Sequence, residues 1–461
     1  MKIKFTNLLL SASFIVGSFN YSIKGQTIAG GFYHSLYTCS DNLPKVSGGN
    51  ADGELGIGTI SNTSSPVAVT SLSGITSMAG NHHSLFVKND GTVWSSGQNY
   101  SGQLGDGTAT GKISPVQVIG LTGIIAASAS ESHSLFLKND GTVWACGRNA
   151  YGQLGDGTIL DKTTPVQVSG LTGVIGIAAG TYHSIFVKSN GTAWSCGYNF
   201  YGQLGDGSTS TNASSTPLQI ATLSGITKVA SFGQRSLFLK NDGTVWGCGY
   251  NAFGILGNGN TSNQSAPVQS PYLSGITEIA PGAFFTLFLK NDNTVLSCGN
   301  NASGQLGNGT LTDQLIPASI TSISGVIKIA AGFEHSIFLK SDASILACGG
   351  NGYGQLGDGS TVKKTTPVSV GGLCTITGQK EIKHQNNLVV FPNPSKGIFK
   401  IEMKDSQSLS YKIYDYSGNE VFCEKEIVTS SLDLSQLSSG IYMLEIQTNV
   451  GIRIQKIVIQ K

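Results

Sequence analysis

Seven copies of one short motif, spaced about fifty residues apart, constrain the fold of this chain more than any other feature. The motif Gly-x-Leu-Gly-x-Gly begins at Gly53, Gly102, Gly152, Gly202, Gly254, Gly304 and Gly354. A second motif, His-Ser-Leu/Ile-Phe/Tyr, begins at His34, His83, His133, His183 and His335, with Arg235 and Phe285 at the first position of the two other copies. A constant period of this length predicts one repeated supersecondary unit.

Each repeat contains four short stretches that are typical of β-strands. In the repeat that begins near residue 124 these are IIAASAS (124–130), HSLFLK (133–138), TVWACG (142–147) and PVQV (165–168). Asp-Gly within KNDG (138–141) is a strong hairpin signal, because the turn needs positive φ. Four antiparallel strands per repeat predict an all-β fold, a seven-bladed β-propeller over residues 27–378.

Two structural questions remain open at this point. A parallel solenoid is the main alternative, and it is disfavoured because hairpins demand antiparallel pairing. The final PVSV (367–370) could complete the first blade, or each repeat could form a blade of its own.

The first 25 residues have the pattern of a secretory signal peptide. Lys2 and Lys4 precede an apolar stretch from Leu8 to Val16, and polar residues follow it. A membrane-spanning helix needs roughly 20 apolar residues, and this run is about half as long. We therefore expect residues 1–25 to be cleaved near Gly25 or Gln26, and no membrane span.

The charge distribution argues against nucleic-acid binding. Residues 27–379 carry 15 basic and 17 acidic side chains, without a cluster of Lys or Arg. Proteins that grip phosphate backbones need such clusters.

Residues 380–461 form a second domain with a different composition. The stretches LVVFPNPSKGIFKI (388–401), YKIYDYSGNEV (411–421) and LDLSQLSSGIYMLEI (432–446) alternate apolar residues with turn formers. This pattern predicts a small C-terminal β-sandwich.

The repeats resemble the regulator of chromosome condensation family. Residues 178–205 read AAGTYHSIFVKSNGTAWSCGYNFYGQLG, which is similar to the repeat unit of that family, and the resemblance covers about residues 27–373. The first repeat departs from the pattern, with KVSGGN (45–50) where the others have Trp. The resemblance implies protein recognition by one propeller face. The eukaryotic namesake is a nuclear nucleotide exchange factor for a small GTPase, and bacterial relatives include a secreted inhibitor of β-lactamases.

The C-terminal domain resembles the sorting domain of the type IX secretion system. The resemblance rests on Pro-Asn-Pro after an aromatic residue, Tyr-Asp-x-x-Gly-x-x-Val, Ser-Gly-Ile-Tyr and a basic last residue, and it covers nearly all of 388–461. It implies that the type IX machinery is a partner, and that the mature protein is secreted through the periplasm or held on the outer-membrane surface. The alternative is a sandwich that binds sugar or packs on the propeller.

Three repeated residue types have structural explanations. The repeat histidines lie on different blades, and their position also accepts Arg and Phe. We therefore expect each imidazole to bond a neighbouring backbone group rather than a metal. Cys146, Cys196, Cys248, Cys298 and Cys348 occupy one buried strand position, and a Cys39–Cys374 bridge is conceivable. Asp106, Asp156, Asp206 and Asp358 fit turn chemistry better than calcium binding, because Asn258 and Asn308 replace them. No metal and no cofactor are expected.

Aromatic residues in the turns between strands are the positive clue to function. In an up-and-down blade, the turn after the first strand and the turn after the third emerge on the same face. These turns supply Phe32, Tyr33, His82, Tyr100, Tyr151, Tyr182, Phe200, Tyr201, Phe253, Phe284, Phe333 and Tyr353. Such residues are enriched where proteins grip partners. The competing interpretation is that the rings lie over the blade tops and seal the core.

We therefore expect a monomeric, non-enzymatic binding protein, secreted or on the cell surface, that recognises an extracellular protein or glycan. The alternatives are a GTPase exchange-type regulator, which would need a cytoplasmic mature protein, and a glycan-active enzyme, which would need convergent carboxylates. The sequence does not identify the ligand, or whether the protein is released or anchored.

Overall fold

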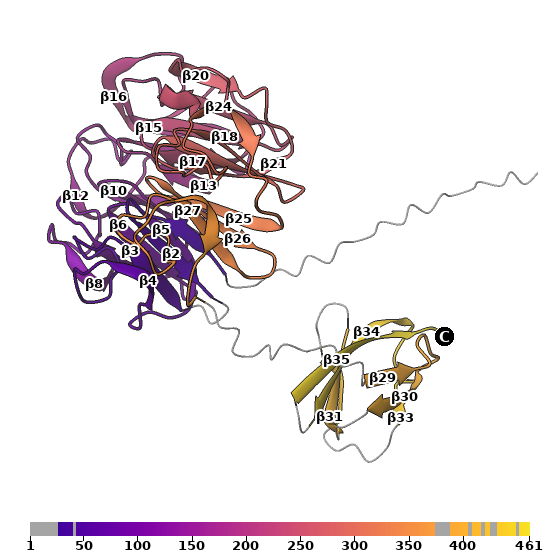
Figure 1. The fold of residues 1–461 in the computed structure, drawn as a ribbon. Coiled ribbons are helices and arrows are strands. Elements are labelled where there is room, and N and C mark those ends of the chain that lie inside the picture. Colours follow the sequence, from indigo (N-terminus) through magenta and orange to yellow (C-terminus); the bar gives the residue numbers. More distant parts are fainter. Residues whose placement is uncertain are drawn as a thin grey trace, which may run out of the picture. The chain divides into compact units, whose positions relative to one another are not determined.

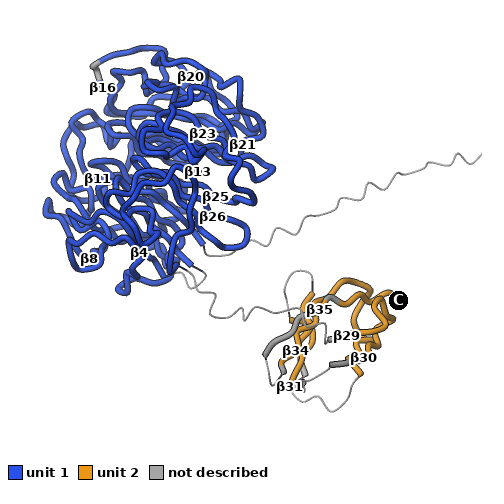
Figure 2. The backbone as a smooth tube through the Cα atoms, in the orientation of Figure 1, with its two compact units in different colours: residues 1–375 blue, residues 376–461 orange. Residues whose placement is uncertain are grey.

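The structure is a computed structural model that describes residues 26–39, 43–373, 388–403, 408–415, 420–424, 431–448 and 451–461. The expected signal peptide and the expected domain boundary near residue 379 lie outside the described residues. The chain divides into two compact units, residues 1–375 and residues 376–461 (Figure 2). The described part of the chain contains 35 strands and one short 3-10 turn, η1 (Ala252–Gly254), so the fold is all-β.

Unit 1 is a seven-bladed β-propeller, as the repeats predict (Figure 1). The first strands of the blades contact one another in a closed ring, and they are β1 (Ile28–Gly30), β5 (Ile75–Gly80), β9 (Ile124–Ala129), β13 (Val174–Ala179), β17 (Ile226–Phe232), β21 (Ile276–Pro281) and β25 (Val326–Ala331). The second strands are β2 (His34–Thr38), β6 (His83–Lys88), β10 (His133–Lys138), β14 (His183–Lys188), β18 (Arg235–Lys240), β22 (Phe285–Lys290) and β26 (His335–Lys340).

The outer half of each blade continues the antiparallel order. The third strands are β3 (Pro44–Gly48), β7 (Val93–Gly97), β11 (Val143–Gly147), β15 (Ala193–Asn199), β19 (Val245–Gly249), β23 (Val295–Gly299) and β27 (Ile345–Gly349). The fourth strands are β4 (Thr63–Ala68), β8 (Lys112–Gln117), β12 (Lys162–Gln167), β16 (Ser210–Gln219), β20 (Gln264–Gln269), β24 (Gln314–Ser319) and β28 (Lys364–Ser369). We call the connection after the first strand of a blade its AB turn, and the connection after the third strand its CD loop.

Each repeat forms a blade of its own, which answers the question that the sequence left open. β28 pairs with β27 of the seventh blade, and β4 completes the first blade by pairing with β3. The ring closes because β1 contacts both β25 and β26 of the seventh blade. The first blade forms a four-stranded sheet despite its irregular sequence.

The second strands are buried almost completely because each lies inside a blade that is covered by a blade on either side. β10, β14 and β26 are buried at five consecutive residues, so their apolar residues do not need to alternate with polar ones. The following turn is sharp, and Gly141 within KNDG adopts a φ of +78°. Asn293 and Ala343 stand at the equivalent position of the sixth and seventh blades and also adopt positive φ.

The second glycine of each Gly-x-Leu-Gly-x-Gly motif packs closely against the next blade. Gly155 of the third blade has a φ of +67°, and a Cβ there would lie 3.0 Å from Sγ of Cys196 in the fourth blade. Gly357 of the seventh blade packs in the same way against Ser47 and Pro66 of the first blade. The contact that joins consecutive blades therefore also closes the ring.

A proline occupies the same position in every outermost strand. These residues are Pro66, Pro115, Pro165, Pro217, Pro267, Pro317 and Pro367. Proline lacks the backbone N–H that a further strand would need, so it protects the exposed edge of each blade from pairing with other chains.

Unit 2 is a small β-sandwich, as predicted. One sheet has the order β29 (Leu388–Phe391), β30 (Ile398–Met403), β33 (Ser431–Asp433). The other has the order β32 (Glu420–Glu424), β31 (Ser408–Tyr414), β34 (Gly440–Thr448), β35 (Gly451–Ile459). Phe399 from the first sheet and Ile413 and Ile457 from the second share one buried core. Among the described residues of both units, no helix is long and apolar enough to cross a membrane.

Candidate binding face

The AB turns and CD loops bring their aromatic side chains together on one face of the propeller. The ring centroids of Tyr151, from a CD loop, and Tyr182, from an AB turn, lie 5.3 Å apart. Tyr33 and Tyr353 are joined in the same way across the first and seventh blades, with centroids 4.6 Å apart. The two kinds of turn therefore share a surface, which is the arrangement that an up-and-down blade requires.

The rings form two connected clusters. The blade 1 cluster has neighbouring centroids 4.1–5.9 Å apart and contains Phe32, Tyr33, His82, Phe253, Phe284, Phe333 and Tyr353. The blade 4 cluster has neighbouring centroids 4.7–6.1 Å apart and contains Tyr151, Tyr182, Tyr198, Phe200, Tyr201 and Tyr250. Arg148 lies over the ring of Tyr182, with 5.5 Å between its guanidinium carbon and the centroid.

The twelve predicted residues differ in how far solvent reaches them. Tyr100, Phe200, Phe253 and Tyr353 are exposed, with accessible fractions of 73%, 48%, 37% and 44%. The other eight are half-buried. Tyr100 belongs to neither cluster, so eleven of the twelve predicted residues meet in ring contacts. The four exposed rings each leave more than a third of their surface accessible to solvent.

A pocket of about 440 Å³ opens on this face where the AB turns of all seven blades converge. Its walls contain one or more residues from each repeat: Phe32, His82, Glu131, Thr181, Tyr182, Tyr201, Phe232, Gly233, Gln234, Tyr250, Ala283, Phe284 and Phe333. Backbone hydrogen bonds link neighbouring AB turns around it, including Thr181 N to Gly233 O at 2.7 Å and Phe32 N to Asn81 O at 2.9 Å. The pocket is therefore framed by backbone as well as by side chains.

Several pocket and cluster residues are absent from the sequence-based prediction. Tyr198 and Tyr250 occupy the middle position of Gly-x-Asn, and their backbone N–H groups donate to Tyr182 O and Gln234 O in the AB turns. That middle position varies between repeats while its neighbours do not, and this variation could have identified it. Phe232 reaches the pocket because β17 pairs with β18 one residue further, up to Phe232 and Arg235.

The repeat histidines join blades to one another. His34 Nε2 lies 2.8 Å from Ser84 Oγ of the second blade, and Ser84 Oγ donates to Glu54 O, back in the first blade, at 2.7 Å. The imidazole was predicted to bond a backbone group, but the Nε2 partner is a serine hydroxyl of the next blade. His183 and His335 also interact with the backbone of the next blade, at Arg235 and His34. Arg235 replaces the serine contact by donating to Gly282 O and Phe285 O, both at 2.7 Å, while Phe285 fills its own site with a buried ring.

Burial sets the protonation of these histidines. Desolvation lowers the pKa of His34, His83, His133 and His183 to about 3, and that of His335 to about 4. They are neutral near pH 7. Within the described ranges, no group of three or more His, Cys, Asp or Glu side chains could hold a metal ion.

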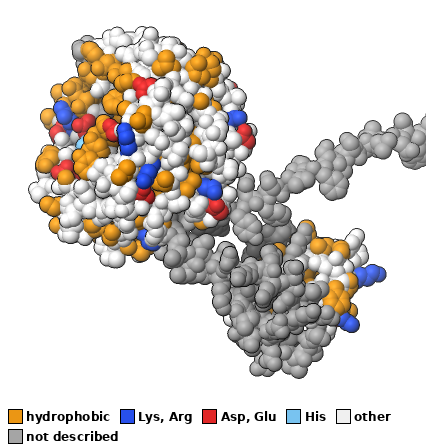
Figure 3. All heavy atoms as spheres, viewed as in Figure 1, with side chains coloured by type: hydrophobic (Ala, Val, Ile, Leu, Met, Phe, Trp, Pro, Cys, Tyr) orange, Lys and Arg blue, Asp and Glu red, His pale blue; other side chains and the backbone are white. Residues whose placement is uncertain are grey.

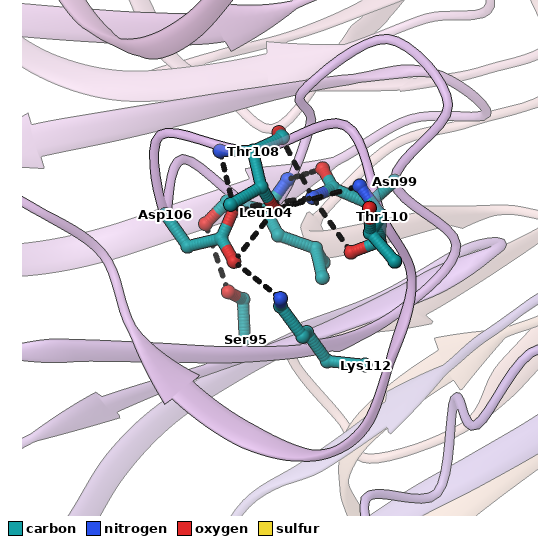
Figure 4. Close-up of polar contacts among 7 residues, drawn as sticks. All are labelled: Ser95, Asn99, Leu104, Asp106, Thr108, Thr110 and Lys112. Atoms are coloured by element: carbon teal, nitrogen blue, oxygen red, sulfur yellow. Dashed lines mark hydrogen bonds and ion pairs between the residues drawn. The ribbon is translucent and has the colours of Figure 1, made fainter.

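The aspartate of Gly-Gln-Leu-Gly-Asp-Gly organises its own loop (Figure 4). Asp106 Oδ1 accepts hydrogen bonds from Thr108 N at 3.0 Å and from Asn99 Nδ2 at 3.1 Å, and Lys112 Nζ lies 3.2 Å from Asp106 Oδ2. Burial opposes ionisation of Asp106, but the bonds from Thr108 and the Lys112 ammonium lower its pKa below the usual value. Asn258 accepts the same bond from Asn251 Nδ2 at 3.1 Å. These contacts support turn chemistry.

The cysteines divide into two kinds. The five repeat cysteines are buried free thiols that lie under the loop of the preceding blade, and burial raises the pKa of Cys298 to about 12. Cys423 is free and exposed. Cys39 is disulfide-bonded, and its Sγ lies 3.3 Å from Leu373 O. Cys374, the candidate partner named above, lies outside the described residues.

Charged side chains are sparse on the visible side of unit 1, where they stand singly or beside one of opposite sign among hydrophobic and uncharged groups (Figure 3). The structure therefore shows no basic stripe on the described surface seen in this view.

Comparison with protein families identifies both units. Residues 161–387 match the model of the RCC1-like domain, and residues 90–137 and 124–153 match regulator of chromosome condensation (RCC1) repeats. Residues 389–460 match the secretion system C-terminal sorting domain. No curated protein sequence matches the chain significantly.

Solved structures show the same propeller fold. Human WBSCR16 is 24% identical, with a TM-score of 0.60, over 67% of this chain and 84% of that one. Prp20p from Saccharomyces cerevisiae is 18% identical, with a TM-score of 0.63, over 83% of this chain and 93% of its own. Yeast RCC1 (Prp20) bound to Kap60 is 17% identical at the same TM-score. At these identities the likeness is one of fold alone.

Proposed function

The chain is a propeller of RCC1 repeats joined to a secretion system C-terminal sorting domain, and from that premise we propose that it is a secreted or cell-surface binding protein, without catalytic activity, that uses the aromatic face to recognise an extracellular protein or glycan. The observation that carries the proposal is the convergence of turns from all seven blades around one pocket, with aromatic residues from six of them. The sorting domain supports a site of action outside the cytoplasm, and it disfavours an exchange-type regulator of a cytoplasmic or nuclear GTPase.

The composition of the face supports recognition. Tyr and Phe supply large contact areas with few rotatable bonds, so ordering them on binding costs little conformational entropy. Phe200, Phe253 and Tyr353 leave more than a third of their surface accessible although the propeller has a well-filled core. Loops carried on a rigid scaffold are the usual location of binding residues.

The pocket offers little for catalysis of glycoside hydrolysis. That reaction uses two carboxyl groups that flank the scissile bond, roughly 5 to 9.5 Å apart. Glu131 is the one carboxylate among the described lining residues. This supports binding without turnover.

Ligand capture by the full chain tests the proposal. The protein is immobilised and exposed to culture medium and outer-surface material of the producing cells and to a glycan array. In the test variant, Phe200, Phe253 and Tyr353 are all replaced with Ala. We expect this variant to lose capture by more than about tenfold while keeping its melting temperature, because these three rings are the exposed members of the two clusters.

The control removes exposed apolar side chains elsewhere on the propeller. Ile125 and Ile175 are 54% and 52% exposed, and they lie near the start of β9 and β13, at the other end of these strands from the AB turns. Ile125→Ala with Ile175→Ala should leave capture unchanged. Unchanged capture by a folded test variant would show that the aromatic face is not the binding surface.

A further inference from the structure

The pocket at which the AB turns of all seven blades converge is called the axial pocket below. Glu131 is the one charged side chain among its described lining residues, and the other lining residues are aromatic or uncharged. It forms no salt bridge within 4 Å in the part of the chain that the structure describes. The carboxylate acts electrostatically on two rings of the pocket, His82 and Tyr182, which come from the blades on either side of it. The carboxyl group of Glu131 therefore stands between two aromatic rings from the neighbouring blades.

A second polar atom of the pocket also lacks a donor. Oε1 of Gln234, at the tip of the turn between β17 and β18, is buried and has no hydrogen-bond partner among the described residues. A buried acceptor without a donor is costly, so a ligand that supplies N–H groups would gain from meeting it. Glu131 and Gln234 both offer acceptor oxygens, so both favour a ligand that carries several hydrogen-bond donors.

The remaining walls favour a positive charge as well. Tyr182, Tyr201, Tyr250, Phe284 and Phe333 present aromatic rings, whose faces carry partial negative charge and attract cations within about 6 Å. His82 does not oppose this, because desolvation lowers its pKa and keeps the imidazole neutral near pH 7.

We propose that the axial pocket binds an alkylammonium or guanidinium group, with the cation against Glu131 and its apolar stem between the aromatic rings. This rests on the proposed binding face and names the chemistry that it recognises. Such a group could belong to a small organic cation or to a Lys or Arg side chain of a protein partner.

Two cations lie close to this pocket: Arg148 over the ring of Tyr182, which lines the pocket, and Arg235 beneath it. The guanidinium of Arg235 donates to the backbone oxygens of Phe232, Ala283, Gly282 and Phe285 at 2.7–3.2 Å, and the side chain is buried. Arg235 belongs to the fifth blade, whereas Glu131 belongs to the third. The bound cation is therefore expected closer to Glu131 than to Arg235.

A matched ligand series on the full chain tests the charge preference. The probes are N-acetyl-lysine methylamide, its norleucine analogue of similar shape without charge, and the anionic glutamate analogue, with binding followed by ligand-observed NMR. We expect the lysine probe to bind about tenfold more tightly than the norleucine probe, and the glutamate probe most weakly. Raising NaCl from about 0.02 to 0.5 M should weaken the lysine probe alone, because salt screens the attraction.

Glu131→Gln removes the charge and keeps the shape of the side chain. We expect it to abolish the tenfold preference without changing affinity for the norleucine probe. Asp140→Asn is the matched control, because it removes the same charge from the same blade in the exposed turn between β10 and β11, where Asn190 stands naturally in the next repeat. It should keep the preference.

Two further arms identify the source of the cation and the competing ligand classes. Tighter binding of tetramethylammonium than of the lysine probe would assign the pocket to a small cation, and the reverse to a protein side chain. Three outcomes would each overturn the proposal. The three probes could bind with equal affinity, or the anionic probe could bind most tightly. The pocket could also bind a neutral oligosaccharide with an affinity that Glu131→Gln leaves unchanged. In those cases the variant with Phe200, Phe253 and Tyr353 replaced by Ala is decisive. If it still loses capture, the proposed binding face stands and only the proposed preference for a cation fails.

Discussion

Each buried repeat histidine takes part in a two-way connection between consecutive blades. His133 Nε2 lies 3.0 Å from Ser184 Oγ, and Ser184 Oγ donates its single hydrogen to Gln153 O of the third blade at 2.7 Å. The serine must therefore accept from the imidazole, which places the proton on Nε2. Burial keeps this imidazole neutral by lowering its pKa to about 3. Burial at the blade contact therefore couples folding to the protonation state of the histidine.

This coupling predicts acid sensitivity of the propeller. The folded-state pKa of His183 is about 3, far below the value near 6.5 of an unfolded chain. Between these values the unfolded state binds protons that the folded state refuses, so stability is full above about pH 6.5 and falls as pH is lowered. Each such histidine should remove about 2 kcal/mol between pH 7 and pH 5.

A single substitution isolates one histidine. His183→Phe copies the sixth blade, where Phe285 packs on Gly282 just as His183 packs on Gly180. Its melting temperature should be lower than that of the wild type at pH 7.5, and the difference should shrink towards pH 5, as measured by calorimetry. A difference in melting temperature that stays constant across this range would show that burial does not lower the pKa of His183.

At the scale of elements, glycines with positive φ serve two different purposes, as the motif glycine Gly155 and Gly170 beyond the motif show. Gly155 and Gly170 both adopt positive φ, +67° and +71°. A Cβ on Gly155 would meet Cys196 Sγ and Val168 Cγ1 at 3.0 Å, whereas a Cβ on Gly170 would meet nothing within 4 Å. One glycine is needed for its backbone angle and for close packing between blades, the other for its backbone angle alone.

The two substitutions to alanine should therefore differ in cost. Gly170→Ala is expected to lower the free energy of unfolding by roughly 1 kcal/mol through backbone strain. Gly155→Ala adds a steric clash across the blade contact and should cost roughly 2–4 kcal/mol. Urea denaturation measures both, and equal losses would exclude the packing contribution.

Local sequence patterns made the strands predictable, but the contacts between repeats could not be predicted from them. Asp-Gly turns and apolar stretches act over a few residues, so the four strands per repeat could be read directly. The partner of His34 lies fifty residues away, and its identity depends on how blades meet in the closed ring. Phe232 entered the pocket through one extra strand pair, which no periodic signal marks. Glu131 became a candidate only when its neighbours from adjacent blades were known.

For the whole molecule, the two units have separate hydrophobic cores. The core of the sandwich consists of residues between Val390 and Ile459, while the propeller core is divided among clusters such as the one that contains Leu135 and Phe186. Cooperative unfolding requires that the loss of one core destabilises the other. Separate cores therefore predict two thermal transitions in the full chain.

Core substitutions in each unit test this independence. Ile413→Val removes one methylene from the sandwich core, where Ile413 is fully buried, and should cost about 0.5–1.5 kcal/mol. Leu135→Ala in the propeller should cost about 2–5 kcal/mol. In differential scanning calorimetry, each variant should shift one transition and leave the other within error. If either substitution moves both transitions together, the sorting domain and the propeller unfold as one body, and the sorting domain would have to contribute to the stability of the propeller as well as to its export.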